Sequence, residues 1–199
     1  MRSIAFVSCL GIFAAGALSA QEVPPFSFAI GGGYTNSLGS AGRYLDNGWN
    51  LQAGGGYNFN SYLGAMLDFN YSSMGINSAT LANIGAPGGN AHIMSFTVDP
   101  IVHLHRKGPV DFYLVGGGGI YHRYDDLTAP SVGFAPFYGP IAEETVLASY
   151  SINKPGFDAG AGVTLGTKWH AKFYVEARYN RMLTSTPTDY IPITAGLRW

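Results

Sequence analysis

Apolar and polar side chains alternate along much of the chain. The clearest stretch runs from Trp49 to Tyr71, where the odd positions are mostly apolar and the even positions are polar or small. The alternation breaks only at Phe59-Asn60-Ser61. A period of two residues is typical of a β-strand with two different faces. The stretch therefore predicts two strands joined by a three-residue turn, since an odd number of turn residues keeps odd positions opposite odd ones.

The length and the ends of these two strands are typical of a membrane hairpin. Each strand covers about ten residues, the length that a tilted strand needs to cross the hydrocarbon of a bilayer. Aromatic residues mark the ends of the apolar faces, at Trp49, Tyr57 and Tyr71, and aromatic rings favour the membrane interface. The pattern predicts a hairpin of a β-barrel whose apolar face contacts lipid and whose polar face lines the lumen.

The same alternation predicts eight strands in all. Their ranges are 26–35, 49–58, 62–71, 91–105, 110–123, 157–167, 172–183 and 190–199. In the fifth strand both faces carry apolar residues, and we expect the even positions to point outward because Asp111 then faces the lumen. Connections that alternate between short and long predict an all-β fold, an eight-stranded antiparallel up-and-down transmembrane β-barrel with short periplasmic turns.

Three connections are expected to be long external loops. They are residues 36–48, 72–90 and 125–156. Within the last, Glu144–Ile152 alternates on the parity opposite to the sixth strand, which predicts an extension of that strand above the membrane, broken by a bulge near Lys154-Pro155-Gly156. Two prolines fall inside predicted strands, where a missing N–H group interrupts the ladder. We expect a bulge at Pro100 and a position above the membrane for Pro192.

Composition supports a membrane barrel. Charged residues make up 12% of the chain, about half the usual share. Yet no stretch beyond residue 20 is continuously apolar over the length that a spanning helix needs. The 28 glycines and 13 tyrosines suit close-packed inward faces and membrane interfaces. A formal net charge of −1 without basic clusters argues against nucleic-acid binding.

The first residues predict export. Residues 1–20 have the pattern of a secretory signal peptide, with a positive start, an apolar run from Ile4 to Ala15, and small residues before cleavage after Ser19 or Ala20. We expect residues 21–199 to form a single outer-membrane β-barrel domain.

Charged residues at lumen-facing positions are the main candidate site. They are Asp68, Asp99, Asp158, Lys172, Glu176 and Arg178. A charge on the lipid face costs about 2–4 kcal/mol at the membrane midplane, and both signs are present, so we expect these groups to pair inside the lumen. The hairpin register expected here places Thr164 opposite Glu176 and Gly162 opposite Arg178. We favour a hydrogen-bonded plug with small or rare conductance, and a selective lumen is the alternative.

Histidines form two weaker candidate sites. His103 and His105 lie two residues apart on one face of a strand, a spacing that can hold a metal, but the sequence indicates no third ligand. Pairing across the following turn places His92 near His122 and Arg123 at the outer rim. Ordinary interfacial polarity is the simpler interpretation of both groups. We therefore expect no catalytic residues, no metal site and no cofactor.

Four stretches carry a resemblance to a known family. They are GGGYNFNSYLGAMLDFNY, DFYLVGGGGIY, AGAGVTLGTKWHAKFYVEARYN and ITAGLRW, spread over Phe26–Trp199. They resemble the eight-stranded outer-membrane barrels that include the OmpA-type transmembrane domain and opacity-type porins. The resemblance implies the outer membrane of a Gram-negative-type bacterium, contact with its lipid, and insertion by the barrel-assembly machinery. The end of the chain, with Leu197 and Trp199 pointing outward, resembles the signal that this machinery reads.

The resemblance identifies an architecture better than a function, because the family includes adhesins, wall-tethering proteins, narrow pores and small-molecule binders. Its lipid A deacylase type carries His-x-Ser-Asn in the late strands, where this chain reads EARYNRMLTS. We therefore expect a non-enzymatic barrel whose external loops, chiefly 72–90 and 125–156, contact a host or cell-surface ligand. A narrow pore or small-solute channel is the alternative. A soluble lipocalin-like barrel, with its apolar faces inward, is a third.

Overall fold

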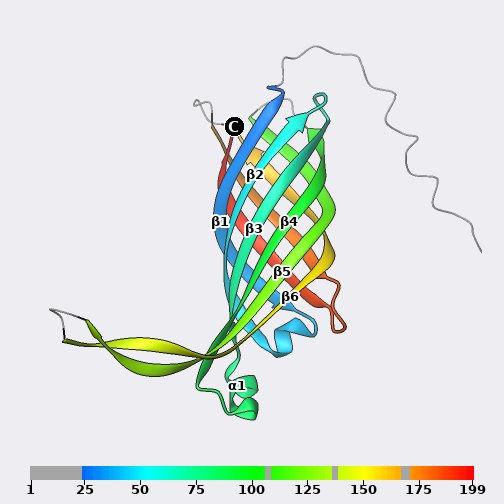
Figure 1. Ribbon diagram of the computed structural model, residues 1–199. Helices are drawn as coiled ribbons and strands as arrows, with labels where there is room; N and C mark the ends of the chain where they lie inside the picture. Colours follow the sequence, from blue (N-terminus) through cyan, green and yellow to red (C-terminus); the bar gives the residue numbers. More distant parts are fainter. Residues whose placement is uncertain (1–23, 106–108, 136–138, 167–170) are drawn as a thin grey trace, which may run out of the picture.

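Eight antiparallel strands close into one barrel (Figure 1). The computed structural model describes residues 24–105, 109–135, 139–166 and 171–199, so the predicted signal peptide lies outside the described residues. Each strand pairs with the next, and the last pairs with the first. The predicted eight-stranded up-and-down barrel is therefore confirmed. The strands are β1 (Phe26–Leu38), β2 (Leu45–Asn58), β3 (Leu63–Ile76), β4 (Gly88–His105), β5 (Val110–Ala135), β6 (Gly139–Leu165), β7 (Lys172–Met182) and β8 (Thr188–Arg198).

The two ends of the barrel differ. The C-terminus lies at one end, and α1 (Ser78–Ile84) and the projecting parts of β5 and β6 lie at the other, called the external end below (Figure 1). A short 3-10 helix, η1 (Ala41–Arg43), also lies between strands. Among the described residues, no helix combines the length and apolarity needed to cross a membrane.

The strand faces follow the predicted alternation, even in the ambiguous β5. Phe112 and Leu114 are exposed on the outside of the barrel, whereas Asp111 and Tyr113 are buried inside it. The even positions of β5 therefore point outward, as predicted. Large apolar side chains cover the outer surface because lipid, rather than a protein core, is the medium they contact.

Aromatic rings gather near both ends of this apolar surface. Toward the external end, Trp49 and Tyr71 have ring centroids 5.3 Å apart, and His92 stacks on Tyr71 at 5.9 Å. At the opposite end, the rings of Phe26 and Tyr57 lie 5.6 Å apart. Amphipathic rings at these levels are typical of the two membrane–water interfaces.

The turn between β2 and β3 differs from the prediction. Asn58 pairs with Gly64, so the connection is longer than the expected three residues and the register is displaced by two. The Asn60 side chain explains the wider turn, because its Oδ1 accepts hydrogen bonds from the backbone N–H groups of Tyr62 (2.7 Å) and Leu63 (2.9 Å). A displacement of two residues leaves every side chain on its predicted face.

The prediction for Pro100 was wrong. Pro100 pairs with Ala65 of β3 in an unshifted register. On the β5 side, the pairs that flank it, Val98 with Gly118 and Ile101 with Val115, also share one register. No bulge forms there, because each residue of an antiparallel strand bonds to one neighbour only, and the missing N–H group removes a single bond.

Pro192 also differs from its expected place above the membrane. It pairs with Thr35 of β1 and is buried in the lumen wall, where it lines the same small cavity as Arg178. The β7–β8 ladder is interrupted beside it, between the pairs Ala177–Ile193 and Asn180–Tyr190. The interruption accommodates the proline without displacing the register.

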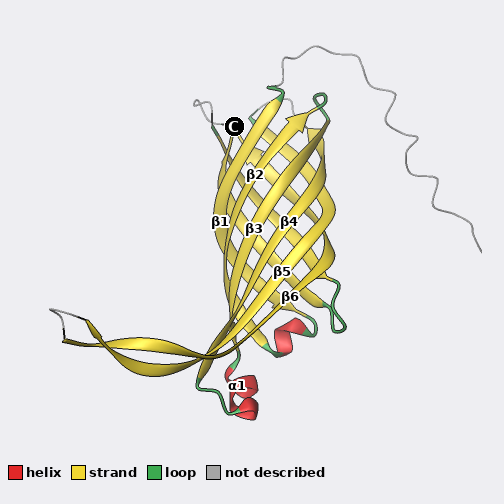
Figure 2. Cartoon of the chain, in the orientation of Figure 1, coloured by secondary structure: helices red, strands yellow, loops and turns green. Residues whose placement is uncertain are grey.

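The segment 125–156 was predicted to be a loop apart from an extension of the sixth strand at Glu144–Ile152. The extension is confirmed, and most of the rest is strand as well. β5 has 26 residues and β6 has 27, and their paired ends project as a two-stranded ribbon beyond the barrel (Figure 2). No register shift occurs near Lys154-Pro155-Gly156. The bulge lies instead at Leu147, since Leu127 pairs with Ala148 and Thr128 with Val146. Between the bulge and the barrel wall the register is unbroken. The even position Ile152 packs against buried side chains inside the barrel, so the change of parity in the sequence reflects an apolar inward face rather than a bulge.

The other two predicted external loops are shortened by their flanking strands. β1 extends to Leu38 and β3 to Ile76, and α1 occupies the second loop. The helix begins after Asn77, whose side chain accepts the N–H of Thr80 at 2.8 Å, and ends at Gly85 in a left-handed conformation with a φ of 69°.

Candidate functional site

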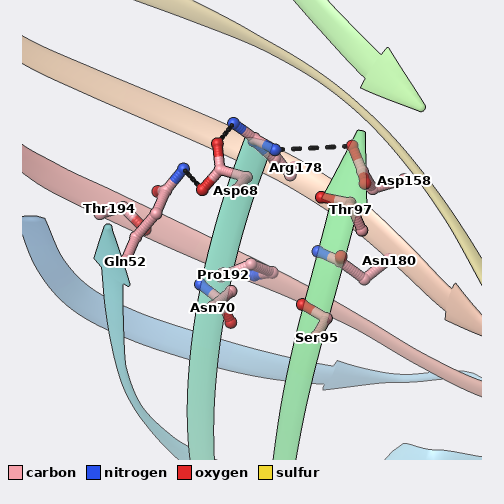
Figure 3. A pocket seen from close by; sticks show the side chains of 10 residues that line it. All are labelled: Gln52, Asp68, Asn70, Ser95, Thr97, Asp158, Arg178, Asn180, Pro192 and Thr194. Atoms are coloured by element: carbon pink, nitrogen blue, oxygen red, sulfur yellow. Dashed lines mark hydrogen bonds and ion pairs between the residues drawn. The ribbon is translucent and has the colours of Figure 1, made fainter. Parts of the chain in front are cut away.

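Arg178 of β7 is the centre of the charged group in the lumen (Figure 3). Its Nη2 donates to Asp68 Oδ2 and its Nη1 to Asp99 Oδ2, both at 2.6 Å. Its Nε donates to Glu176, and Asp158 Oδ1 lies 3.7 Å from Nη1. All five side chains are at most 7% exposed. One guanidinium thus joins carboxylates from three other elements of the sequence, β3, β4 and β6, to its own strand.

Neutral and basic side chains complete this network. Gln52 Nε2 donates to Asp68 Oδ1 at 3.1 Å and to Glu176 Oε1 at 3.0 Å. The Tyr113 hydroxyl donates to Glu176 Oε2 at 2.8 Å, and Arg198 Nη2 lies 3.6 Å from the same atom. Sequence reasoning missed Gln52, Tyr113 and Arg198 as partners, although strand parity points all three into the lumen.

Lys172 does not join the network, in contrast to our expectation. It is the first residue of β7, at the end opposite α1, and its side chain is exposed. At the barrel rim an ammonium group on a long stem can remain in water. The structure therefore brings together five of the six predicted lumen residues and leaves Lys172 outside.

Glycines of β6 make room for the network, but at positions displaced from the prediction. Gly160 pairs with Arg178, and Gly162 pairs with Glu176. A methyl group at Gly160 would collide with the Arg178 side chain and with a backbone oxygen, and one at Gly162 would collide with the Tyr113 ring. The β6–β7 ladder is displaced by two residues from the predicted one. The predicted pairings of Thr164 with Glu176 and of Gly162 with Arg178 were therefore wrong.

Two apolar layers lie on either side of the charged network. Along β7 the inward residues run from Tyr174 through Glu176 and Arg178 to Met182. The outer apolar layer, toward the external end, consists of Ala41, Leu45, Met74, Ala91, Ile93, Tyr121, Met182 and Tyr190. The inner apolar layer consists of Ala29, Met66, Ile101, Tyr113, Val115 and Tyr174.

These three layers fill the barrel. The cavity beside Arg178 has a volume of about 10 Å³, and another between Met66 and Arg198 has about 20 Å³. Each offers room for little more than one water molecule. Eight strands enclose an interior that side chains can just fill, and here the described side chains do so.

His103 lies in the lumen, where it has a carboxylate partner. It is buried, and its Nδ1 lies 2.7 Å from Asp111 Oδ2. The side chain of His105 lies outside the described part of the structure. Of the two histidines considered as metal ligands, the structure describes the side chain of His103 alone, and His103 contacts Asp111.

His92 and His122 do not face one another as expected. The strand register pairs His92 with Tyr124. His92 Nε2 lies 3.2 Å from Asp126, whereas His122 Nδ1 lies 2.7 Å from Asn153 Oδ1. The β4–β5 register shifts between His103 and His105, which leaves His92 and His122 as diagonal neighbours with different partners. Within the described ranges, no cluster of three or more His, Cys, Asp or Glu side chains is arranged to hold a metal ion.

The projecting ribbon is the largest external feature. Its described apolar side chains are exposed, with Val132 at 79% and Tyr150 at 60%. The ribbon beyond the β4–β5 pairs, residues 129–145, contains two acidic residues, Glu143 and Glu144, and no Lys or Arg. The ribbon therefore presents two carboxylates beside apolar side chains, and its described residues beyond Thr128 of β5 and before Gly156 of β6 have one paired edge and one open edge.

Comparisons with known proteins agree with this architecture. Residues 5–197 match the family model described as outer membrane protein beta-barrel domain. A similar solved structure is Neisserial surface protein A, with 16% identity, a TM-score of 0.59, and coverage of 87% of this chain and 96% of that chain. A major outer membrane protein from Thermus thermophilus has 10% identity, a TM-score of 0.52, and coverage of 87% and 98%. A search of curated proteins finds no match.

At these identities the solved structures show the fold, and the match to the family model shows the family to which the chain belongs. This protein belongs to the outer membrane protein beta-barrel domain family and is a protein of the bacterial outer membrane.

Proposed function

We propose that this protein is a non-enzymatic surface-contact barrel that binds a host or cell-surface protein through its external segments. The observation that carries the proposal is the ribbon formed by β5 and β6. Two strands alone are marginally stable in water, and this pair exposes apolar side chains such as Val132 and Ile141. Such a ribbon suits a partner that covers those side chains.

The ribbon also offers a mode of binding. An unpaired strand edge can accept an extended segment from another protein, which adds a strand through main-chain hydrogen bonds. The two acidic residues of the ribbon, Glu143 and Glu144, favour a partner segment that carries basic residues. The rigid barrel below holds the ribbon at the cell surface.

A shortened ribbon tests the proposal. Residues 129–145 are replaced by Asn-Gly, which joins the paired residues Thr128 and Val146 by a two-residue hairpin turn. We expect cells that display this variant to lose binding to host cells or matrix protein, while the gel shift of unheated protein shows an intact barrel. A matched control, the substitution Ile84→Gln on α1, should retain binding. Undiminished binding by the shortened variant would refute a role for the ribbon.

The filled lumen argues against the alternative of a channel. The charged network around Arg178 lies between two apolar layers, and the cavity beside it measures about 10 Å³. We expect only small or rare conductance from purified protein in planar bilayers. A steady, large and ungated conductance would contradict a closed lumen.

A further inference from the structure

A cavity of about 320 Å³ opens at the external end of the barrel. We call it the external cup. Its walls come from the end of β3, from α1, from the start of β2 and from the bases of the β5 and β6 projections. Five aliphatic side chains contribute to its lining: Leu45, Ile76, Ile84, Leu127 and Ala148.

The floor of the external cup is the outer apolar layer of the lumen. Leu45 is 3% exposed and belongs to that layer, and Ile76 packs against it. The rim, in contrast, is open to solvent, with Ile84 at 54% and Tyr150 at 60% exposure. A molecule that enters the cup would cover these rim side chains and would stop at the filled lumen.

The charges in the external cup neutralise each other. Arg123 Nε donates to Asp125 Oδ1 at 2.8 Å, and Arg123 Nη1 donates to Thr188 Oγ1 at 3.2 Å. The other lining residues are uncharged. A charged ligand would have to displace Asp125 or Arg123 from its partner, whereas an uncharged ligand leaves the pair intact.

From this combination we propose that the external cup binds a small, uncharged, apolar molecule, an aromatic or branched compound with few polar atoms. The volume lies at the lower end of the range for small-molecule sites, which are mostly apolar with a few polar groups. The site does not depend on the ribbon tip, because shortening at residues 129–145 leaves Leu127 and Tyr150 in place. Loss of one binding activity therefore says nothing about the other.

Indole is a suitable probe because it is uncharged, aromatic and soluble in water. The full protein is placed in lipid nanodiscs with its Ile and Leu methyl groups labelled, and indole is titrated while methyl NMR shifts are recorded. We expect saturable shifts at Ile76, Ile84 and Leu127, with no change at lipid-facing Leu67, which is 67% exposed on the barrel wall.

Two tryptophan substitutions separate the cup from its surroundings. Ala148→Trp fills the cup and should weaken indole binding by about tenfold or more. Val132→Trp places the same side chain on the ribbon and should leave the titration unchanged. If Ala148→Trp fails the gel-shift test for folding, Ile84→Gln serves instead, since Ile84 lies on α1 outside the barrel wall.

Two results would overturn the proposal. Shifts that rise linearly with indole and include Leu67 would show partition into lipid rather than binding. Contacts between the Ile84 methyl and lipid acyl protons that indole does not displace would show that a membrane lipid occupies the cup.

Discussion

Replacing Arg178 by methionine should destabilise the barrel more than any other single change in the lumen. Methionine keeps an unbranched apolar stem but removes the guanidinium. Asp68 and Asp99 then each lose a charged hydrogen bond of 2.6 Å, and Glu176 loses one as well. The remaining nearby guanidinium, that of Arg198, lies 3.6 Å from Glu176, so most of the buried negative charge would be uncompensated.

The expected loss can be estimated from the burial of these groups. Removing one member of a buried ion pair costs about 3–5 kcal/mol, because the other charge remains buried without a partner. This corresponds to an increase of about two to three and a half powers of ten in the unfolding equilibrium constant. Urea unfolding in lipid vesicles, followed by tryptophan fluorescence, measures the change, and the gel shift of unheated samples should be lost at a lower temperature.

Two further variants test the reasoning. Lys172→Met removes a cation from the same strand, but its side chain is exposed, so we expect a change within about 0.5 kcal/mol. Adding Asp68→Asn and Asp99→Asn to Arg178→Met removes two uncompensated charges and should restore part of the lost stability. Equal effects of Arg178→Met and Lys172→Met would show that Arg178 is solvated and that the lumen network is wrong.

Three other changes are expected to act locally. Asn77→Ala removes the cap of α1 and should cost about 1 kcal/mol of helix stability. Faster amide exchange at Thr80 would show the loss. A shifted unfolding midpoint of the whole barrel would contradict a local role. Gly162→Val should lower the free energy of unfolding by about 1–3 kcal/mol, because the added side chain crowds Tyr113. Gly75→Val is the matched control in the same urea titration, since the nearest atom to an added Cβ there lies 3.9 Å away. His103→Leu leaves Asp111 buried without its partner and should cost about 1–3 kcal/mol of unfolding free energy. If the double variant His103→Leu/Asp111→Leu is no more stable than His103→Leu alone, the 2.7 Å contact contributes nothing to stability.

Alternation predicted the barrel because each strand has lipid on one face. Residues on the outer face are apolar, so the period of two can be recognised in the sequence. In β5, where both faces carry apolar residues, Asp111 indicated which face points into the lumen. Only the β6 side of the ribbon was predicted, as an extension at Glu144–Ile152, and the β5 side escaped prediction because no membrane acts on it. Its strands carry prolines such as Pro130, and the apolar Ile152 packs inside the barrel instead of facing lipid, which obscures the alternation that leads into the barrel.

The charged network was predictable in its members but less so in its contacts. Parity points Asp68, Asp99 and Arg178 inward, and the low polarity of the surroundings requires them to pair. Which side chains meet depends on the register, and hairpin turns leave an uncertainty of two residues that does not change the faces. Contacts across the lumen, such as Gln52 with Glu176, join strands that are not neighbours, so pairing rules for adjacent strands do not reach them.

The seam between β1 and β8 sets the order of events in folding. Phe28 and Trp199 exchange two backbone hydrogen bonds, of 2.7 and 2.9 Å, although they lie near opposite ends of the sequence. Contacts so distant along the chain are slow to form, because the whole intervening loop must be closed first. Until β8 has reached β1, each of these two strands keeps an unpaired edge. Ring closure is thus a late step of folding, and any factor that covers the two open edges until then protects the chain from pairing with its neighbours.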